Sequence, residues 1–379
     1  MDALRLANTA LAVDVFKNLC EKNKTDNIIF SPICISTSLA LAHKGSKGNT
    51  ASELEKVLHL EKVKDRDFGF QSLASDISKI SSIYSLKLVK RLYVEKSIDC
   101  TKDFINSAKK PYPLELEPID IKSQAGEARN QINSSVKDLT DGKIENILGE
   151  DACDENTRML MVGAAYFKGS WLYKFNESET KEVEFHINKN ETRPVQMMYL
   201  EARLSIGYIN DLKTMILELP FTSKHLSLLI LLPKKIEDDS TGLEKLEQDL
   251  TYEKYVHWTN PSMMANSKVK LCLPKFKLES TYDLKDTLKS LGLNDAFNEE
   301  VADFSGMSES KSISVSQAIH KACIEVDEDG SEIADVTKER LLMHKEEFFV
   351  DHPFLFILRH NKTRTILMYG RYCCPTAAS

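Results

Sequence analysis

The sequence predicts one large α+β domain. Helical patterns gather within residues 1–150, whereas apolar segments typical of strands follow one another through the rest of the chain. This segregation is typical of an α+β fold and not of a repeated βαβ unit. No Pro/Gly/Ser-rich linker, shift in composition or internal repeat divides the chain, so we expect residues 1–379 to form a single domain.

The first helices each carry a local signal. Residues 1–20 place apolar side chains along one helical face and interrupt them with polar ones, which predicts an amphipathic helix. Ser31 and Pro32 put a capping hydroxyl before a proline at the first helical position. Thr50 and Glu53 have the spacing of a capping box. We therefore expect one helix to begin at each of these two points.

Apolar periodicity predicts the remaining elements. We expect helices near 69–83 and 125–140, and a late helix over 283–291 that Gly292 ends. Strands are expected at 86–94, 159–167, 215–221, 226–232, 269–278, 313–326, 354–359 and 365–372. Strands should therefore dominate the second half of the chain.

Composition excludes several classes of protein. The 379 residues are 42% hydrophobic and 28% charged, as in folded proteins with a large core. The net charge of −7 excludes a general nucleic-acid surface. The longest apolar run, Leu226–Leu232, is far shorter than the roughly 20 residues that span a bilayer. Residues 1–20 lack the apolar core of a cleaved signal peptide, so we expect a cytoplasmic protein, any extracellular pool being reached without one.

Eight cysteines are scattered along the chain without CxxC spacing or clustered histidines. Neither a zinc site nor a compact disulfide framework is indicated, and we expect reduced thiols and no metal or other cofactor. Sequons begin at Asn23, Asn133, Asn176, Asn190 and Asn361, and the sequence leaves their use open.

The signatures of common enzymes are missing: there is no GxSxG, HExxH, GxGxxG or Walker loop, so we expect no catalytic activity. Glu325 to Gly330 imitates the start of a calcium loop, but the twelfth position would be Val336 instead of a bidentate glutamate. His320 lies in a predicted strand and is interpreted as a buried, hydrogen-bonded core residue.

Residues 330–351 form a polar, charged connection between two apolar strands. Connections of this length are usually functional or disordered. Within it, Arg340 followed by Leu341 would suit a trypsin-like protease. Elsewhere, Lys87, Lys90 and Arg91 are candidates for a small patch that binds sulfated polysaccharide, although a solvated strand face explains them about as well.

Six segments together resemble the serpin family, in the right order along the chain. They are NIIFSPICISTSLALA (27–42), AAYFKGSW (164–171), LPKFKL (273–278), ADFSGMS (302–308), HKACIEVDEDG (320–330) and HPFLFILRHN (352–361). The lack of a signal-peptide pattern resembles the ovalbumin-like branch of that family. Four more segments are similar to one member of the branch: 1–4, 90–94, 260–266 and 343–347. The resemblance implies three β-sheets, about nine helices and an exposed reactive-site loop over about 330–351.

The resemblance also implies a polar shutter network beneath the large sheet, with which a breach site is grouped. Ser31 and His320 match the network, and Trp171 is placed with these sites. Gly163 stands where the family usually has asparagine, and Cys34 stands at a common serine position. Fewer partners for His320 should weaken control over sheet opening.

An inhibitory serpin inserts its cleaved loop as a new central strand, which buries every second residue. The hinge residues are Gly330, Ser331, Ile333, Asp335 and Glu339. One register buries Ser331, Ile333, Asp335, Thr337 and Glu339, and the other buries Glu332, Ala334, Val336, Lys338 and Arg340. Either register buries at least two ionisable groups, which costs several kcal/mol or forces their neutralisation.

We therefore expect a monomeric, non-inhibitory serpin that acts through protein partners, among which extracellular-matrix and cell-surface proteins are candidates. The similar member of the branch implies that it restrains epithelial cell growth, motility and invasion. The alternative is an inhibitor of a trypsin-like protease that recognises Arg340, and a storage protein is a third, weaker reading.

Overall fold

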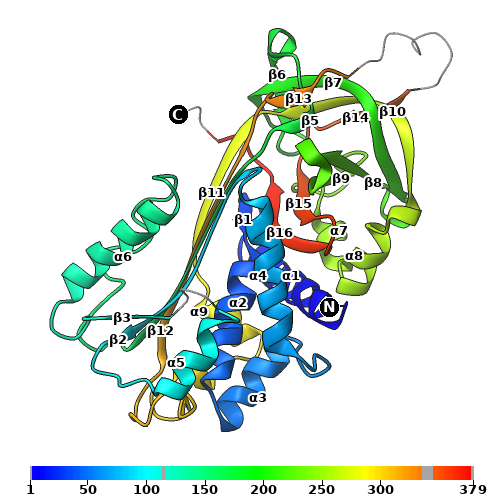
Figure 1. Ribbon diagram of the computed structural model, residues 1–379. Helices are drawn as coiled ribbons and strands as arrows, with labels where there is room; N and C mark the ends of the chain where they lie inside the picture. Colours follow the sequence, from blue (N-terminus) through cyan, green and yellow to red (C-terminus); the bar gives the residue numbers. More distant parts are fainter. Residues whose placement is uncertain (1, 113–115, 335–344, 377–379) are drawn as a thin grey trace. The chain divides into compact units, whose positions relative to one another are not determined.

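The computed structural model describes residues 2–112, 116–334 and 345–376 of the chain. Within these ranges it has nine α-helices (Figure 1). They are α1 (Asp2–Lys22), α2 (Pro32–Lys44), α3 (Gly48–Val57), α4 (Arg66–Ile80), α5 (Lys102–Lys109), α6 (Ala125–Leu139), α7 (Glu244–Asp249), α8 (Tyr252–Trp258) and α9 (Lys285–Ser290). No helix of this described part is both long and apolar enough to cross a membrane.

The strands fall into three sheets. In chain order they are β1 (Ile28–Phe30), β2 (Ser85–Glu95), β3 (Leu116–Ile119), β4 (Met159–Lys168), β5 (Trp171–Tyr173), β6 (Lys181–His186), β7 (Thr192–Ile209), β8 (Thr214–Pro220), β9 (Leu226–Pro233), β10 (Met264–Pro274), β11 (Phe276–Asp283), β12 (Val315–Val326), β13 (Gly330–Glu332), β14 (Glu346–Phe349), β15 (Phe354–His360) and β16 (Thr365–Tyr372). A nine-stranded sheet has the order β1-β16-β15-β9-β8-β7-β10-β14, with β6 paired to β7. A five-stranded sheet runs β11-β12-β4-β2-β3, and β13 pairs with β5. The predicted α+β class, with three sheets and nine helices in the described residues, is confirmed.

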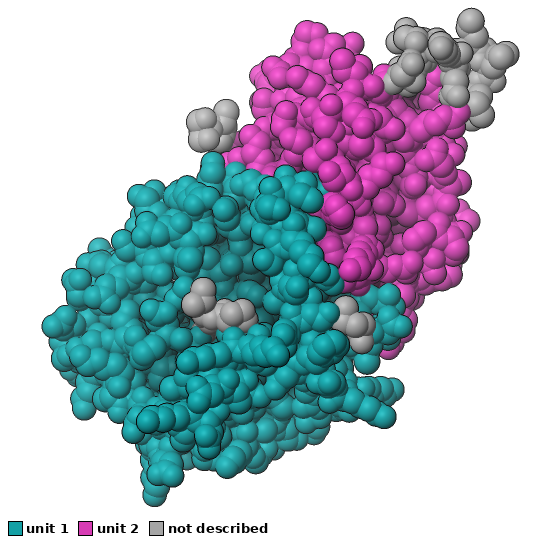
Figure 2. All heavy atoms as spheres, in the orientation of Figure 1, with its two compact units in different colours: residues 1–18, 30–166, 280–323 teal, residues 19–29, 167–279, 324–379 magenta. Residues whose placement is uncertain are grey.

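The chain forms two compact units (Figure 2). Unit 1 comprises residues 1–18, 30–166 and 280–323, and unit 2 comprises residues 19–29, 167–279 and 324–379. Each unit is assembled from three separate stretches of sequence, so neither can be cut out as one continuous segment.

In unit 1, helix α6 covers one face of the five-stranded sheet (Figure 1). Ile132 and Val136, four residues apart, share one helical face and are fully buried. They belong to one apolar cluster with Leu160 and Val162 on β4. The apolar spacing that predicted a helix near 125–140 thus also determines which face of that helix packs on the sheet.

In unit 2, the core consists of strands buried along their whole length. Every residue of β9, β15 and β16 is buried, and these strands are neighbours in the nine-stranded sheet. Their sequences are nearly unbroken apolar runs because both faces of the sheet are covered there. This explains why the predictions 226–232, 354–359 and 365–372 agree with the strands to within a residue.

The predicted capping box was wrong. Helix α3 begins at Gly48, ahead of Thr50, whose buried hydroxyl instead accepts a hydrogen bond from the Asp303 amide at 2.9 Å. Glu53 accepts one from the Asp295 amide at 2.8 Å. Both side chains therefore connect α3 to a distant segment, because tertiary donors compete successfully with the local ones.

The single strand predicted at 269–278 is two strands. β10 ends at Pro274 and β11 begins at Phe276, in a different sheet. Proline has no amide hydrogen to continue a ladder, and the next amide, on Lys275, donates to the Gln196 carbonyl at 2.8 Å.

Candidate functional site

The first hinge residues are already paired with a strand. β13 runs parallel to β5, with Gly330 opposite Trp171 and Glu332 opposite Tyr173. The Lys174 amide donates to the Glu332 carbonyl at 2.7 Å. In the five-stranded sheet β4 and β12 are direct neighbours.

Gly330 allows the close approach of β13 to β5. A Cβ at this position would lie 2.5 Å from the Cα of Lys174. Because this clash is with the backbone, no side-chain rotation could relieve it. The Ser331 hydroxyl lies 3.3 Å from the Leu172 carbonyl, whereas the Ile333 side chain is 89% exposed. The predicted hinge and reactive-site residues Asp335, Glu339, Arg340 and Leu341 lie outside the described residues.

Trp171 is the centre of an aromatic cluster at this hinge. Its indole Nε1–H donates to the Asp327 carbonyl at 2.8 Å. Its ring stacks on Phe221 at 4.3 Å between centroids and meets Phe175 edge-on at 6.2 Å. Through its bond to Asp327 the cluster holds the chain that precedes Gly330.

Glu328 is a site residue that the sequence reasoning missed. It is buried, and its carboxylate accepts from the Thr180 hydroxyl at 2.8 Å and pairs with the Lys275 ammonium at 2.9 Å. Burial acts to raise the pKa of this carboxyl, but the hydrogen bonds from Lys275 and Thr180 bring it below its ordinary value. Glu328 is one of several acidic residues in this segment, and nothing in the sequence marks it out for such a role.

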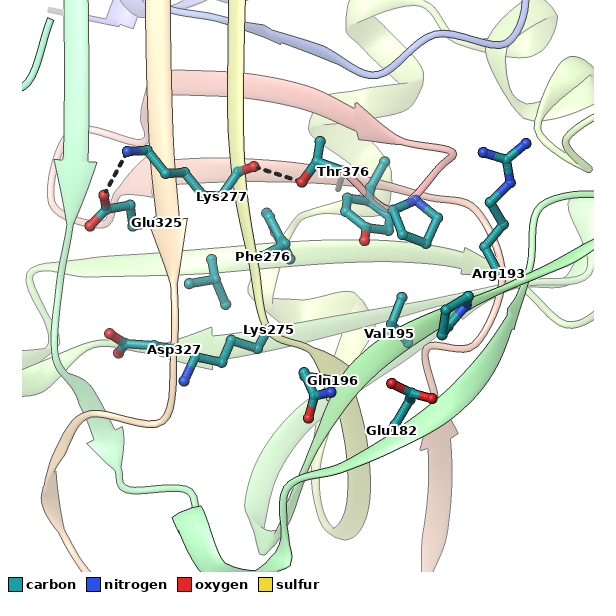
Figure 3. A pocket seen from close by; sticks show the side chains of 14 residues that line it. Glu182, Arg193, Val195, Gln196, Lys275, Phe276, Lys277, Glu325, Asp327 and Thr376 are labelled. Carbon is teal, nitrogen blue, oxygen red and sulfur yellow. Dashed lines mark hydrogen bonds and ion pairs between the residues drawn. The ribbon is translucent and has the colours of Figure 1, made fainter. Parts of the chain in front are cut away.

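A recess of about 650 Å³ lies beside these residues (Figure 3). Phe276 and Tyr372 line it, with ring centroids 4.9 Å apart. Along one side the Lys277 ammonium pairs with Glu325 at 3.4 Å, and Arg193 projects from the opposite side. Aromatic rings and paired charges thus line the recess.

The four predicted shutter residues of unit 1 meet around His320. The Ser31 amide donates to Nε2 of His320 at 2.9 Å, so the proton of the neutral ring is on Nδ1, which faces Gly163. Cys34 lies against the same position, and its thiol donates to the Ala164 carbonyl at 3.7 Å. Complete burial lowers the pKa of His320 to about 3.

This network is incompletely satisfied. Among the described residues, neither Nδ1 of His320 nor the Ser31 hydroxyl has a hydrogen-bond partner. The predicted capping role of that hydroxyl was therefore wrong: Ser31 precedes α2, but its side chain makes no cap bond. Its amide binds the imidazole instead. Trp171 belongs to unit 2 and is not part of this cluster.

Replacing Gly163 by alanine is expected to destabilise the protein by about 1–3 kcal/mol. The new Cβ would lie 2.9 Å from Nδ1 of His320, inside van der Waals contact and in a packed interior. Gly126→Ala is the matched control, since a Cβ there meets no atom within 4 Å. Urea unfolding of both variants tests the difference, and equal stabilities would contradict it.

The basic side chains of the predicted polysaccharide patch are largely neutralised. Lys87 pairs with Asp141 at 2.8 Å, and Arg91 pairs with Glu117. Lys90 also has an interaction partner. This strand therefore offers less positive charge to a sulfated polysaccharide than its sequence indicates.

All eight cysteines are free thiols in the described structure. Burial raises the pKa of Cys272 and of Cys373 to about 12, so both are protonated at neutral pH. We expect eight titratable thiols in the denatured protein and slow reaction of the four buried ones, Cys20, Cys34, Cys323 and Cys373, in the folded protein. Titration with a thiol reagent checks this, and four or fewer thiols after denaturation would reveal disulfides.

Comparison with known proteins extends over nearly the whole chain. Residues 6–375 match the family model "Serpin (serine protease inhibitor)". Serpin B5 of Xenopus laevis is 77% identical over 379 residues, covering 100% of this chain and 99% of that protein.

Two solved structures are similar throughout. A crystal structure of maspin has a TM-score of 0.96 and 54% identity, over 99% of each chain. The structure of a tumour suppressing serpin has a TM-score of 0.93 and 54% identity, over 99% of this chain and 100% of that one.

Proposed function

The chain belongs to the serpin family, and from that premise we propose that it is a non-inhibitory serpin that acts by binding protein partners. Within the family it is similar to maspin and Serpin B5 over nearly its whole length. The segments 1–4, 90–94, 260–266 and 343–347 are the ones that resemble maspin in the sequence.

The observation that carries this proposal is the exposed Ile333 side chain next to the paired strand β13. Ser331 and Ile333 are two residues apart and share one face of an extended chain. Insertion would bury Ile333 in a row that accepts small side chains, and overpacking of this kind costs about 1–3 kcal/mol. In the same register Asp335 and Glu339 would leave water, which adds a larger penalty.

The hydrogen bonds that pair β13 with β5 add a second free-energy cost to loop insertion. In this proposal an inserting strand would enter between β4–β5 and β12–β13, so the backbone bonds between residues 171–174 and 329–332 would have to break first. These include the Lys174 amide to Glu332 at 2.7 Å and the Trp171 amide to Asp329 at 2.9 Å. Buried backbone groups that lose such partners cost about 1–3 kcal/mol each until new ones form.

The biological role in this proposal is restraint of epithelial cell growth, motility and invasion, and it rests on similarity to a tumour suppressing serpin. The protein would act as a monomer without catalysis or a cofactor. Its partners would include matrix or cell-surface adhesion proteins, met in an extracellular pool beside a cytoplasmic one.

The alternative is inhibition of a trypsin-like protease at Arg340, which the adjacent Leu341 and the charged connection favour. Incubation with a panel of trypsin-like proteases, followed by denaturing gel electrophoresis, separates the two functions. We expect clean cleavage without a covalent complex. A complex that survives denaturation would establish the inhibitor instead.

A further inference from the structure

An apolar row crosses three strands at one end of the nine-stranded sheet. Cys272 of β10 is the ladder partner of Tyr199 on β7 and of Phe349 on β14. The three side chains therefore lie side by side on one face. Phe349 is 41% exposed.

These residues line a recess of about 550 Å³. That volume is within the range of protein sites that take a small molecule or a large side chain. The Lys181 ammonium lies 5.1 Å from the centre of the Tyr199 ring and closes one side. Phe349 of β14 also lines it.

A charged row runs parallel to the apolar one, two residues away along each strand. Lys270 of β10 is the partner of Glu201 on β7 and of Glu347 on β14, so the charges alternate negative, positive, negative. Lys345 also pairs with Glu201 at 2.9 Å. Glu347 ends the row, is exposed, and has no ion pair among the described residues.

β14 is the last strand of this sheet within the described chain. The Val350 amide donates to the Cys272 carbonyl at 2.9 Å, so alternate residues of this segment bond to β10. Glu347 and Phe349 lie between them and direct their backbone N–H and C=O groups away from β10. The same two residues thus present the open backbone edge and the exposed side chains.

We propose that this edge binds an extended segment of a partner protein, which adds a strand beside β14. Its side chain opposite Phe349 would be aromatic and would continue the apolar row beyond Phe349. Its side chain opposite Glu347, two residues away, would be Lys or Arg and would continue the alternation of charge. This inference names the chemistry of a partner for the proposed function and rests on it.

The test uses the full-length protein and two fluorescein-labelled, end-blocked heptapeptides with Lys-Val-Phe or Phe-Val-Lys at their centres. The two orders correspond to the two possible strand directions. Fluorescence anisotropy should show saturable binding of one order, with a Kd of roughly 10–100 µM. N-methylation of the peptide amides that face β14, either that of the central valine or those of its neighbours, should weaken binding of that peptide by about tenfold or more.

Variants separate this surface from general stickiness. Phe349→Ser should weaken binding about tenfold, whereas Phe68→Ser, which removes a 62% exposed phenylalanine from α4, should not change it. Glu347→Lys should reverse the charge preference, so that a peptide with Glu in place of Lys binds better. Circular dichroism checks that each variant is folded.

Absence of saturation below about 1 mM for both peptides would overturn the inference. So would wild-type affinity in Phe349→Ser, or an unchanged charge preference in Glu347→Lys. The protease panel is independent of these results. A covalent protease complex would defeat the non-inhibitory function even if the peptides bind, and peptide failure without a complex would defeat only this surface.

Discussion

Cleavage of the Arg340–Leu341 bond is expected to change the melting temperature by only a few degrees. In an inhibitor the cleaved loop becomes a central strand and the protein gains tens of degrees. Here Ile333 would have to be buried on the same face of the inserted strand as Ser331, together with Asp335 and Glu339. The penalties of overpacking and of burying charge should cancel much of the gain from new backbone hydrogen bonds.

The triple variant Ile333→Ala, Asp335→Ala, Glu339→Ala is expected to recover at least part of the rise after the same cleavage. Its matched control is Glu332→Ala with Lys338→Ala, which removes charges from the other register and should leave the small change as it was. Differential scanning calorimetry of cut and intact protein measures all three. A gain of tens of degrees in the melting temperature of the unmodified protein would show that the cleaved loop still inserts. The inhibitor would then become the preferred function.

Acid is expected to destabilise the protein through His320. Burial lowers its folded pKa to about 3, against 6.5 for the ordinary side chain. Between these values the unfolded chain binds a proton that the folded protein does not. The contribution of the neutral His320 side chain to the free energy of unfolding is therefore fully present above pH 6.5. It is lost as the pH falls, by about 1.4 kcal/mol per pH unit. Over the whole window the loss is on the order of 4–5 kcal/mol.

His320→Gln is the test, because glutamine can still accept from the Ser31 amide but does not titrate. The stability advantage of the wild type over this variant should shrink steadily from pH 7 to pH 4. Parallel pH dependence in wild type and His320→Gln would contradict the buried, neutral imidazole.

The prediction of elements succeeded where the signal was local. Helix α6 and strands β2, β4, β9 and β16 agree with their predicted ranges because their apolar period, or an unbroken apolar run, is a property of a short segment. Prediction failed where local and distant partners compete. Thr50 has the right residue type for a cap, yet it binds Asp303, which is 253 residues away in the chain.

The candidate site divides in the same way. The family could be read from motifs around Gly330 and His352. The role of Glu328 could not, since its partners Thr180 and Lys275 come from other strands. The unsatisfied Nδ1 of His320 was foreseen only as a loss of partners at Gly163, and nothing in the sequence indicated that Nδ1 lies so close to Gly163 that a Cβ there would clash with it.

By itself the sequence determined the family, the α+β class and the chemical character of the hinge, because residue type and short-range periodicity are sufficient for these. Only the tertiary structure decided which groups face one another. The alignment of Tyr199, Cys272 and Phe349 depends on strand register, and a shift of one residue would turn each side chain to the opposite face. Register is set by packing and turns across the whole sheet, which no single segment contains.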